Sequence, residues 1–141
     1  MVKLYRYQPI YDKHTIIDAN LPENAIIHLS NDQLEEFDNY QYVAFEEKAP
    51  EQPKGIILEE VVLTAELKEK LRKNSSHWQR YKERVIEKIR EKYSLDDELN
   101  IIHTKNLGTK TTDNKAKISE YDNYVQSVKD YYAKYKESLG I

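Results

Sequence analysis

The chain has no cysteine, only three glycines and four prolines, and no long apolar run. Without cysteine, disulfides, thiolate chemistry and cysteine-ligated zinc sites cannot occur. Three glycines cannot supply the glycine-flanked turn that a serine nucleophile of the G-x-S-x-G type requires. No apolar stretch approaches the roughly 20 residues that span a membrane, and the N-terminal stretch lacks the apolar core of a signal peptide. We therefore expect a soluble protein that contacts no membrane and needs no cofactor.

Charge is unevenly divided along the 141 residues, although the net charge is only −3. Residues 1–63 contain 5 Lys/Arg and 12 Asp/Glu, a net charge of −7. Residues 64–93 contain 10 and 5, net +5, and residues 94–141 contain 7 and 8, net −1. An acidic N-terminal region thus precedes one basic helical segment.

Tyrosine dominates the aromatic residues, with 12 Tyr compared with two Phe and one Trp. Tyrosine combines a large contact area with a polar tip, so it suits half-buried seams and interfaces. The composition leaves two interpretations open: the tyrosines replace phenylalanine in a small core, or they form a surface that binds another protein.

The first half of the sequence has strand character. Short β-branched or alternating segments are typical of strands, and they occur at residues 2–7, 14–18, 25–29, 40–46 and 55–63. Ser30 is followed three residues later by Gln33, a capping-box pattern that predicts a short helix over Asn31 to Phe37. Residues 46–55, with two prolines and one glycine, are typical of a loop.

The second half has helical periodicity. Thr64 is a favourable N-cap, and poor helix formers at residues 74–76 predict an interruption before a regular helix over Trp78 to Arg90. A last helix is expected from about Asp113 to Leu139, with Gly108 as a C-cap position for the helix before it. The fold class is therefore α+β: a small β-rich N-terminal region over residues 1–63, then a C-terminal helical hairpin with a short connecting helix over residues 64–141.

Apolar and aromatic residues recur on one face of both long helices at steps of three and four residues. This stripe either packs inside the chain, as an antiparallel hairpin, or forms a coiled-coil contact with another chain. We take its members as interface or seam residues: Trp78, Tyr81, Val85, Ile89, Tyr121, Tyr124, Val125, Val128, Tyr131, Tyr132 and Tyr135.

An acidic cluster in "YSLDDELNIIHT" separates the two long helices. Ser94 and Asp97 have capping-box spacing, and acidic residues in a first helical turn favour the helix dipole. Leu95, Leu99 and Ile102 would then share one face of a short helix. A metal site that uses these carboxylates is the alternative, but the alternating acidic residues of a calcium loop are absent. We interpret Ser94 and Asp97 as a helix cap.

No residue pattern indicates an enzyme, so we assign neither catalytic nor metal-ligating residues. The four histidines have no i, i+4 pair of the kind that binds zinc on a helix. The basic segment 65–92 could instead bind nucleic acid. Interleaved glutamates in that segment and the acidic overall charge argue against this alternative.

The segments Lys92–Glu98 and Glu120–Val125 resemble parts of small proteins encoded near tail-fibre and baseplate genes in phages of low-GC Gram-positive bacteria. Those proteins combine a basic helix, a "R-Y-S-x-x-D-E" break and an "E-Y-x-x-Y-V" helix, and the resemblance extends at most over residues 84–140. It implies a tail structural component or a tail-fibre assembly chaperone that performs no chemistry. The implied partners are other phage tail or fibre proteins, with a homo-oligomer left open. The implied location is the host cytoplasm during assembly, or the virion tail.

Overall fold

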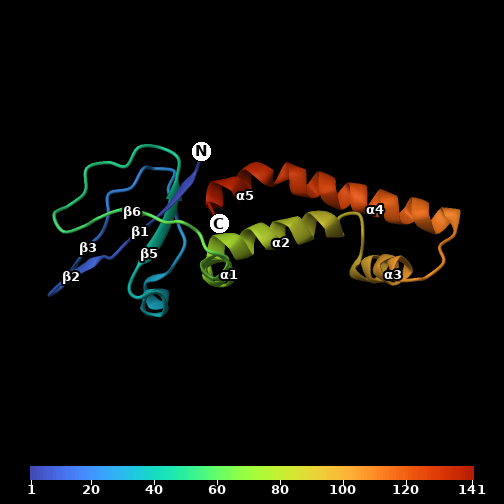
Figure 1. Cartoon of the computed structure of the whole chain (residues 1–141), viewed down its shortest axis with the longest axis horizontal. Helices are drawn as coiled ribbons and strands as arrows, with labels where there is room; N and C mark the ends of the chain where they lie inside the picture. Colours follow the sequence, from blue (N-terminus) through green and yellow to red (C-terminus); the bar gives the residue numbers. More distant parts are fainter. The chain divides into compact units, whose positions relative to one another are not determined.

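The computed structural model describes residues 1–141 and confirms a mixed α and β fold, with strands in the N-terminal part and helices in the C-terminal part (Figure 1). The strands are β1 Lys3–Tyr7, β2 Ile10–Asp12, β3 Thr15–Ile17, β4 Ile26–Ile27, β5 Gln41–Phe45 and β6 Glu59–Glu60, with a 3-10 helix, η1, at Asn31–Phe37. The helices are α1 Ala65–Asn74, α2 Ser76–Arg90, α3 Leu95–Lys105, α4 Thr112–Tyr131 and α5 Ala133–Leu139.

Four strands form one antiparallel sheet in the order β4-β5-β1-β6, and β2 and β3 form a separate hairpin. All five residues of β5 are buried, and the strand pairs with β4 on one side and with β1 on the other. The ring of Tyr5 stacks on that of Phe45 at 4.5 Å between centroids, across the β1–β5 pair. Alternation in the sequence predicted the strand, and the burial of consecutive residues shows that both of its faces are covered.

The predicted strand over residues 55–63 is wrong in its length. Only Glu59 and Glu60 form β6, which pairs with β1 alone at the edge of the sheet. Ile57 and Val62, which made this segment the most apolar candidate, are strongly exposed. β-branched composition indicates a preference for extended backbone, but a ladder also needs a neighbouring strand.

Helix boundaries follow the predicted caps in α1. The Oγ1 atom of Thr64 accepts the N–H of Leu67 at 3.2 Å, and the helix ends at Asn74, the first residue of the predicted interruption. Within η1, the N–H of Ser30 donates to Oε1 of Gln33 at 2.9 Å, although the segment is a 3-10 helix.

Two helix predictions are wrong in detail. The last helix is divided into α4 and α5 at Tyr132, whose backbone leaves the helical conformation. Gly108 is not the C-cap of α3, because the helix already ends at Lys105 with Asn106 as its cap. Glycine is favoured at a cap that needs positive φ, whereas Asn106 retains a right-handed helical backbone.

The chain folds as two compact units. The first comprises Met1–Arg80 and Tyr135–Ile141, and the second comprises Tyr81–Lys134. This division differs from the predicted regions 1–63 and 64–141, because α1 and the last residues of the chain belong to the same unit as the sheet. None of the helices combines the length and the apolar character that crossing a membrane requires.

Candidate interaction surface

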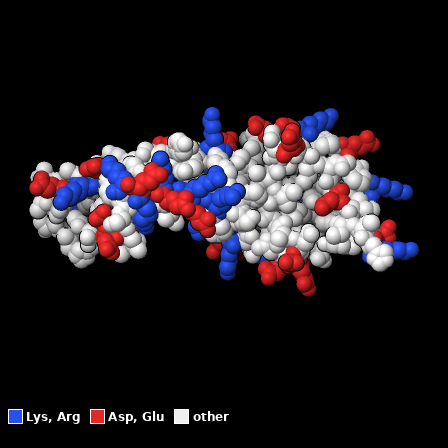
Figure 2. Space-filling model, turned by 180° about the vertical axis from the view of Figure 1, so that it is seen from behind, with Lys and Arg blue, Asp and Glu red and all other residues white.

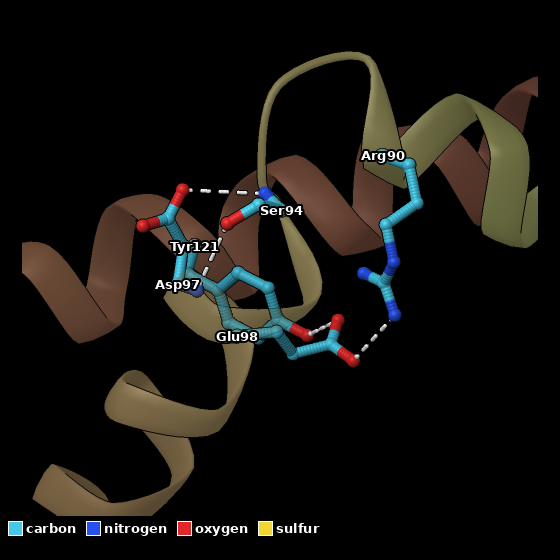
Figure 3. A network of polar contacts seen from close by, with 5 residues as sticks. All are labelled: Arg90, Ser94, Asp97, Glu98 and Tyr121. Atoms are coloured by element: carbon cyan, nitrogen blue, oxygen red, sulfur yellow. Dashed lines mark hydrogen bonds and ion pairs between the residues drawn. The ribbon is translucent and has the colours of Figure 1, made fainter.

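The beginning of α3 is built as the sequence predicts. The N–H of Asp97 donates to Oγ of Ser94 at 3.1 Å, and the N–H of Ser94 donates to Oδ2 of Asp97 at 3.2 Å (Figure 3). The two side chains satisfy two backbone donors that the helix itself leaves unpaired. Ser94 and Asp97 therefore form a capping box, as predicted.

Replacing Ser94 with alanine is expected to lower the free energy of unfolding of the second unit by about 1 kcal/mol, because the N-cap of α3 is lost. Chemical denaturation monitored by far-ultraviolet circular dichroism measures this change. Ser119→Ala, at an exposed position inside α4, is the matched control and should change stability little. An equal effect of both substitutions would contradict the capping role.

Three helices of the second unit meet at Glu98 on α3. One carboxylate oxygen accepts from Nη2 of Arg90 on α2 at 3.2 Å, and the other accepts the hydroxyl of Tyr121 on α4 (Figure 3). The hydrogen bonds from Arg90 and then Tyr121 lower the pKa of Glu98. Burial, followed by the bond to Glu98, raises the pKa of Tyr121 to about 12. Glu98 is thus held as a carboxylate and Tyr121 as a neutral phenol, which suits a structural junction.

Tyr121 and Tyr124 of the predicted stripe pack within this unit, around Tyr93. The ring centroid of Tyr93 lies 5.1 Å from that of Tyr121 and 5.6 Å from that of Tyr124. The hydroxyl of Tyr124 donates to the carbonyl of Lys88 at 2.9 Å, and Lys92 pairs with Glu120 at 3.3 Å. These contacts run in opposite directions along α2 and α4, so the two helices form an antiparallel pair in the second unit.

The stripe residues divide by burial. The buried ones are Trp78, Tyr81, Ile89, Tyr121 and Val128, and the half-buried ones are Val85, Tyr124, Val125, Tyr132 and Tyr135. Tyr131 differs from the rest, because 72% of it is exposed. Most of the stripe is thus covered by the chain itself.

An exposed apolar face lies on α3 instead. Leu95, Leu99 and Ile102 are 55%, 53% and 44% exposed, and steps of four and three residues place them on one side of the helix. Leu107, just beyond the helix, is also exposed. The sequence showed that these leucines and the isoleucine share a face, but it could not show that nothing in the chain covers that face. A row of exposed apolar side chains on a helix is typical of a surface that binds another protein.

The structure bears on two alternatives, a metal site in the acidic cluster and nucleic-acid binding by residues 65–92. No group of three or more histidine, aspartate or glutamate side chains is arranged to hold a metal ion. Several cations of the basic segment contact groups within the chain. Lys70 lies over the ring of Phe37 and Arg72 over the ring of Trp78. Ion pairs join Lys88 to Glu91, Arg90 to Glu98 and Lys92 to Glu120. Acidic and basic side chains lie next to one another on the face of the helical part drawn in Figure 2.

A buried serine–histidine pair in the first unit was missed at the sequence level. Nδ1 of His28 lies 2.7 Å from Oγ of Ser75, and Nε2 lies 2.7 Å from the carbonyl oxygen of Leu139. Because a carbonyl only accepts, Nε2 carries the hydrogen and Nδ1 accepts the serine hydroxyl. Oγ of Ser75 also accepts the N–H of Trp78 at 3.3 Å, so it caps α2. Both side chains are almost completely buried, which makes the pair a structural junction between three segments.

This junction predicts a loss of stability in acid. Burial lowers the pKa of His28 to about 4 from its ordinary value of 6.5. The unfolded chain binds a proton near pH 6.5 and the folded chain does not, so stability is complete above pH 6.5 and falls as the pH decreases from 6.5 towards 4. The loss should reach about 3 kcal/mol. Urea denaturation of the wild type and of His14→Gln, which alters an exposed histidine, should show the same decrease. A pH-independent unfolding energy in this range would contradict it.

Comparisons of the chain with protein-family models, with curated proteins and with solved structures found no match.

Proposed function

We propose that this chain is a non-enzymatic protein–protein interaction protein whose binding surface is the exposed face of α3. The proposal depends on the exposed row formed by Leu95, Leu99 and Ile102, on a helix that Glu98 joins to α2 and α4 through its bonds to Arg90 and Tyr121. An apolar face that is already formed on a folded helix binds a partner without the cost of ordering a disordered segment.

The biological setting that we propose is the phage tail, and it depends on the resemblance of Lys92–Glu98 and Glu120–Val125 to tail-region proteins. Within that setting the chain acts as a structural subunit or as an assembly chaperone for a fibre or baseplate protein. A structural subunit would occur in fixed proportion in purified virions, whereas a chaperone would be sparse in them and bound to its client in the host cytoplasm.

Site-specific photo-crosslinking tests the proposed surface. A photoreactive amino acid placed at residue 99 should form an adduct with a polypeptide when the chain is irradiated in cells that produce the tail proteins. The same group at residue 16, on an exposed isoleucine in the first unit, is the control and should form much less. Mass spectrometry identifies the adduct. Equal labelling at both positions, or adducts with nucleic acid alone, would overturn the proposal.

Nucleic-acid binding by residues 65–92 is the alternative function. It predicts that the purified chain retains nucleic acid, with an affinity that falls steeply as salt rises. The internal contacts of Lys88, Arg90 and Lys92 weigh against it.

A further inference from the structure

The exposed face of α3 is complementary to itself. We propose that it binds α3 of a second copy of the chain, with the two helices antiparallel about a twofold axis beside Leu99. This inference rests on the proposed function, since it names the partner that the same surface takes.

The apolar residues are arranged almost symmetrically about the middle of the face. Leu99 lies between Leu95, four residues before it, and Ile102, three residues after it. When two antiparallel copies pack about an axis beside Leu99, this leucine meets its equivalent, and Leu95 meets Ile102 of the second copy. A twofold interface requires this kind of self-complementary pattern. Each apolar side chain that is half exposed in one copy gains a partner in the other.

The charges beside this row favour the antiparallel arrangement. At 100° per residue, Asp96 and His103 lie on the same edge of the exposed face, one near each end of the helix, and both are exposed. In an antiparallel pair that edge faces its equivalent, so Asp96 of each copy lies near His103 of the other. A histidine ring donates an N–H to a carboxylate in either protonation state. A parallel pair would instead place the acidic first turns, including Asp96 and Asp97, beside each other.

The helix dipoles add to this preference. The first turn of α3 carries Asp96, Asp97 and Glu98, and its last turn carries His103 and Lys105. Antiparallel packing brings the negative end of each dipole near the positive end of the other. The interface is small, with one face of an 11-residue helix from each copy, so the association is weak and depends on protein concentration.

Sedimentation velocity over a concentration series tests the dimer. The wild type should change from its monomer mass of 16.8 kDa towards twice that mass as the concentration rises. Leu99→Lys should weaken the association by about 100-fold, because two leucines are lost and two like charges meet at the axis. Ile16→Lys makes the same chemical change at a side chain that is 52% exposed in the first unit, and should leave the association unchanged. Equal behaviour of both variants would overturn the proposal.

Charge exchange tests the antiparallel register. Asp96→Lys alone and His103→Asp alone should each weaken the association by about tenfold, since like or unpaired charges replace each contact. The double variant restores opposite charges between the copies and should return to within about threefold of the wild type. The two positions are seven residues apart in one helix, roughly 10 Å, so the restored contact cannot form within a copy. Circular dichroism monitors helix content in all variants. A double variant weaker than both single variants would contradict the antiparallel pair.

Failure of the dimer is distinguishable from failure of the proposed function. If the chain is a monomer at all concentrations and residue 99 crosslinks to a different protein, the dimer is wrong and the interaction surface stands. If the chain is a monomer and residue 99 forms no polypeptide adduct, both are wrong.

Discussion

Replacing His28 with alanine is expected to lower the free energy of unfolding by about 4 kcal/mol, because a cavity and two unpaired polar groups appear together. His28 is the group that joins Ser75, at the break between α1 and α2, to the carbonyl of Leu139 near the C-terminus, with both contacts at 2.7 Å. Solvent does not reach Ser75 or Leu139 in the folded chain, because both are completely buried, so water does not replace the lost hydrogen bonds. Equilibrium denaturation in urea at pH 7.5 measures the loss.

A double-substitution cycle separates this junction from a general packing effect. Ser75→Ala alone should cost about 2 kcal/mol, because it removes both the cap of α2 and the donor to His28. The double variant should cost less than the sum of the single variants, since each substitution removes the partner of the other. His14→Ala, at an exposed position, should have little effect. Strictly additive costs for His28 and Ser75 would contradict a direct bond between them.

Val128→Asp is expected to unfold the second unit. It should lower the free energy of unfolding by about 4 kcal/mol, because it buries a charge that has no partner. Val128 is the most deeply buried residue of the stripe on α4. The substitution therefore tests whether the stripe packs inside the chain. Far-ultraviolet circular dichroism reports the helix content, and hydrogen exchange shows whether the loss is confined to residues 81–134.

Tyr131→Asp is the matched control for this change. Tyr131 lies three residues along the same helix but is largely exposed, so its replacement should cost less than about 1 kcal/mol. A folded Val128→Asp variant that loses an oligomer instead of stability would show that the stripe joins two chains. A folded variant with unchanged stability and mass would contradict both interpretations.

Local patterns in the sequence predicted the features whose causes are local. The caps at Thr64 and Ser94 were found because a hydroxyl and a backbone donor three residues apart are sufficient to define them. The interruption at residues 74–76 follows from poor helix formers in the same way. Gly108 misled the prediction because Asn106 ended α3 first, without the left-handed backbone that favours glycine.

Features that depend on distant partners could not be read from the sequence. His28 meets Ser75 and Leu139 across 47 and 111 residues, and no periodicity connects such positions. The exposure of α3 has the same origin: the sequence places Leu95, Leu99 and Ile102 on one face, but only the packing of the whole unit decides whether that face is covered. The length of β6 has the same origin: it pairs with β1 only at Glu59 and Glu60, and composition does not reveal where two distant segments pair.

Methyl nuclear magnetic resonance of the chain at low and high concentration tests most directly whether α3 binds a second copy. The methyl signals of Leu95, Leu99 and Ile102 should shift as the concentration rises, while those of Ile16 and the buried Val128 should stay in place. Signals of α3 that stay in place over the whole concentration range would contradict the dimer through α3.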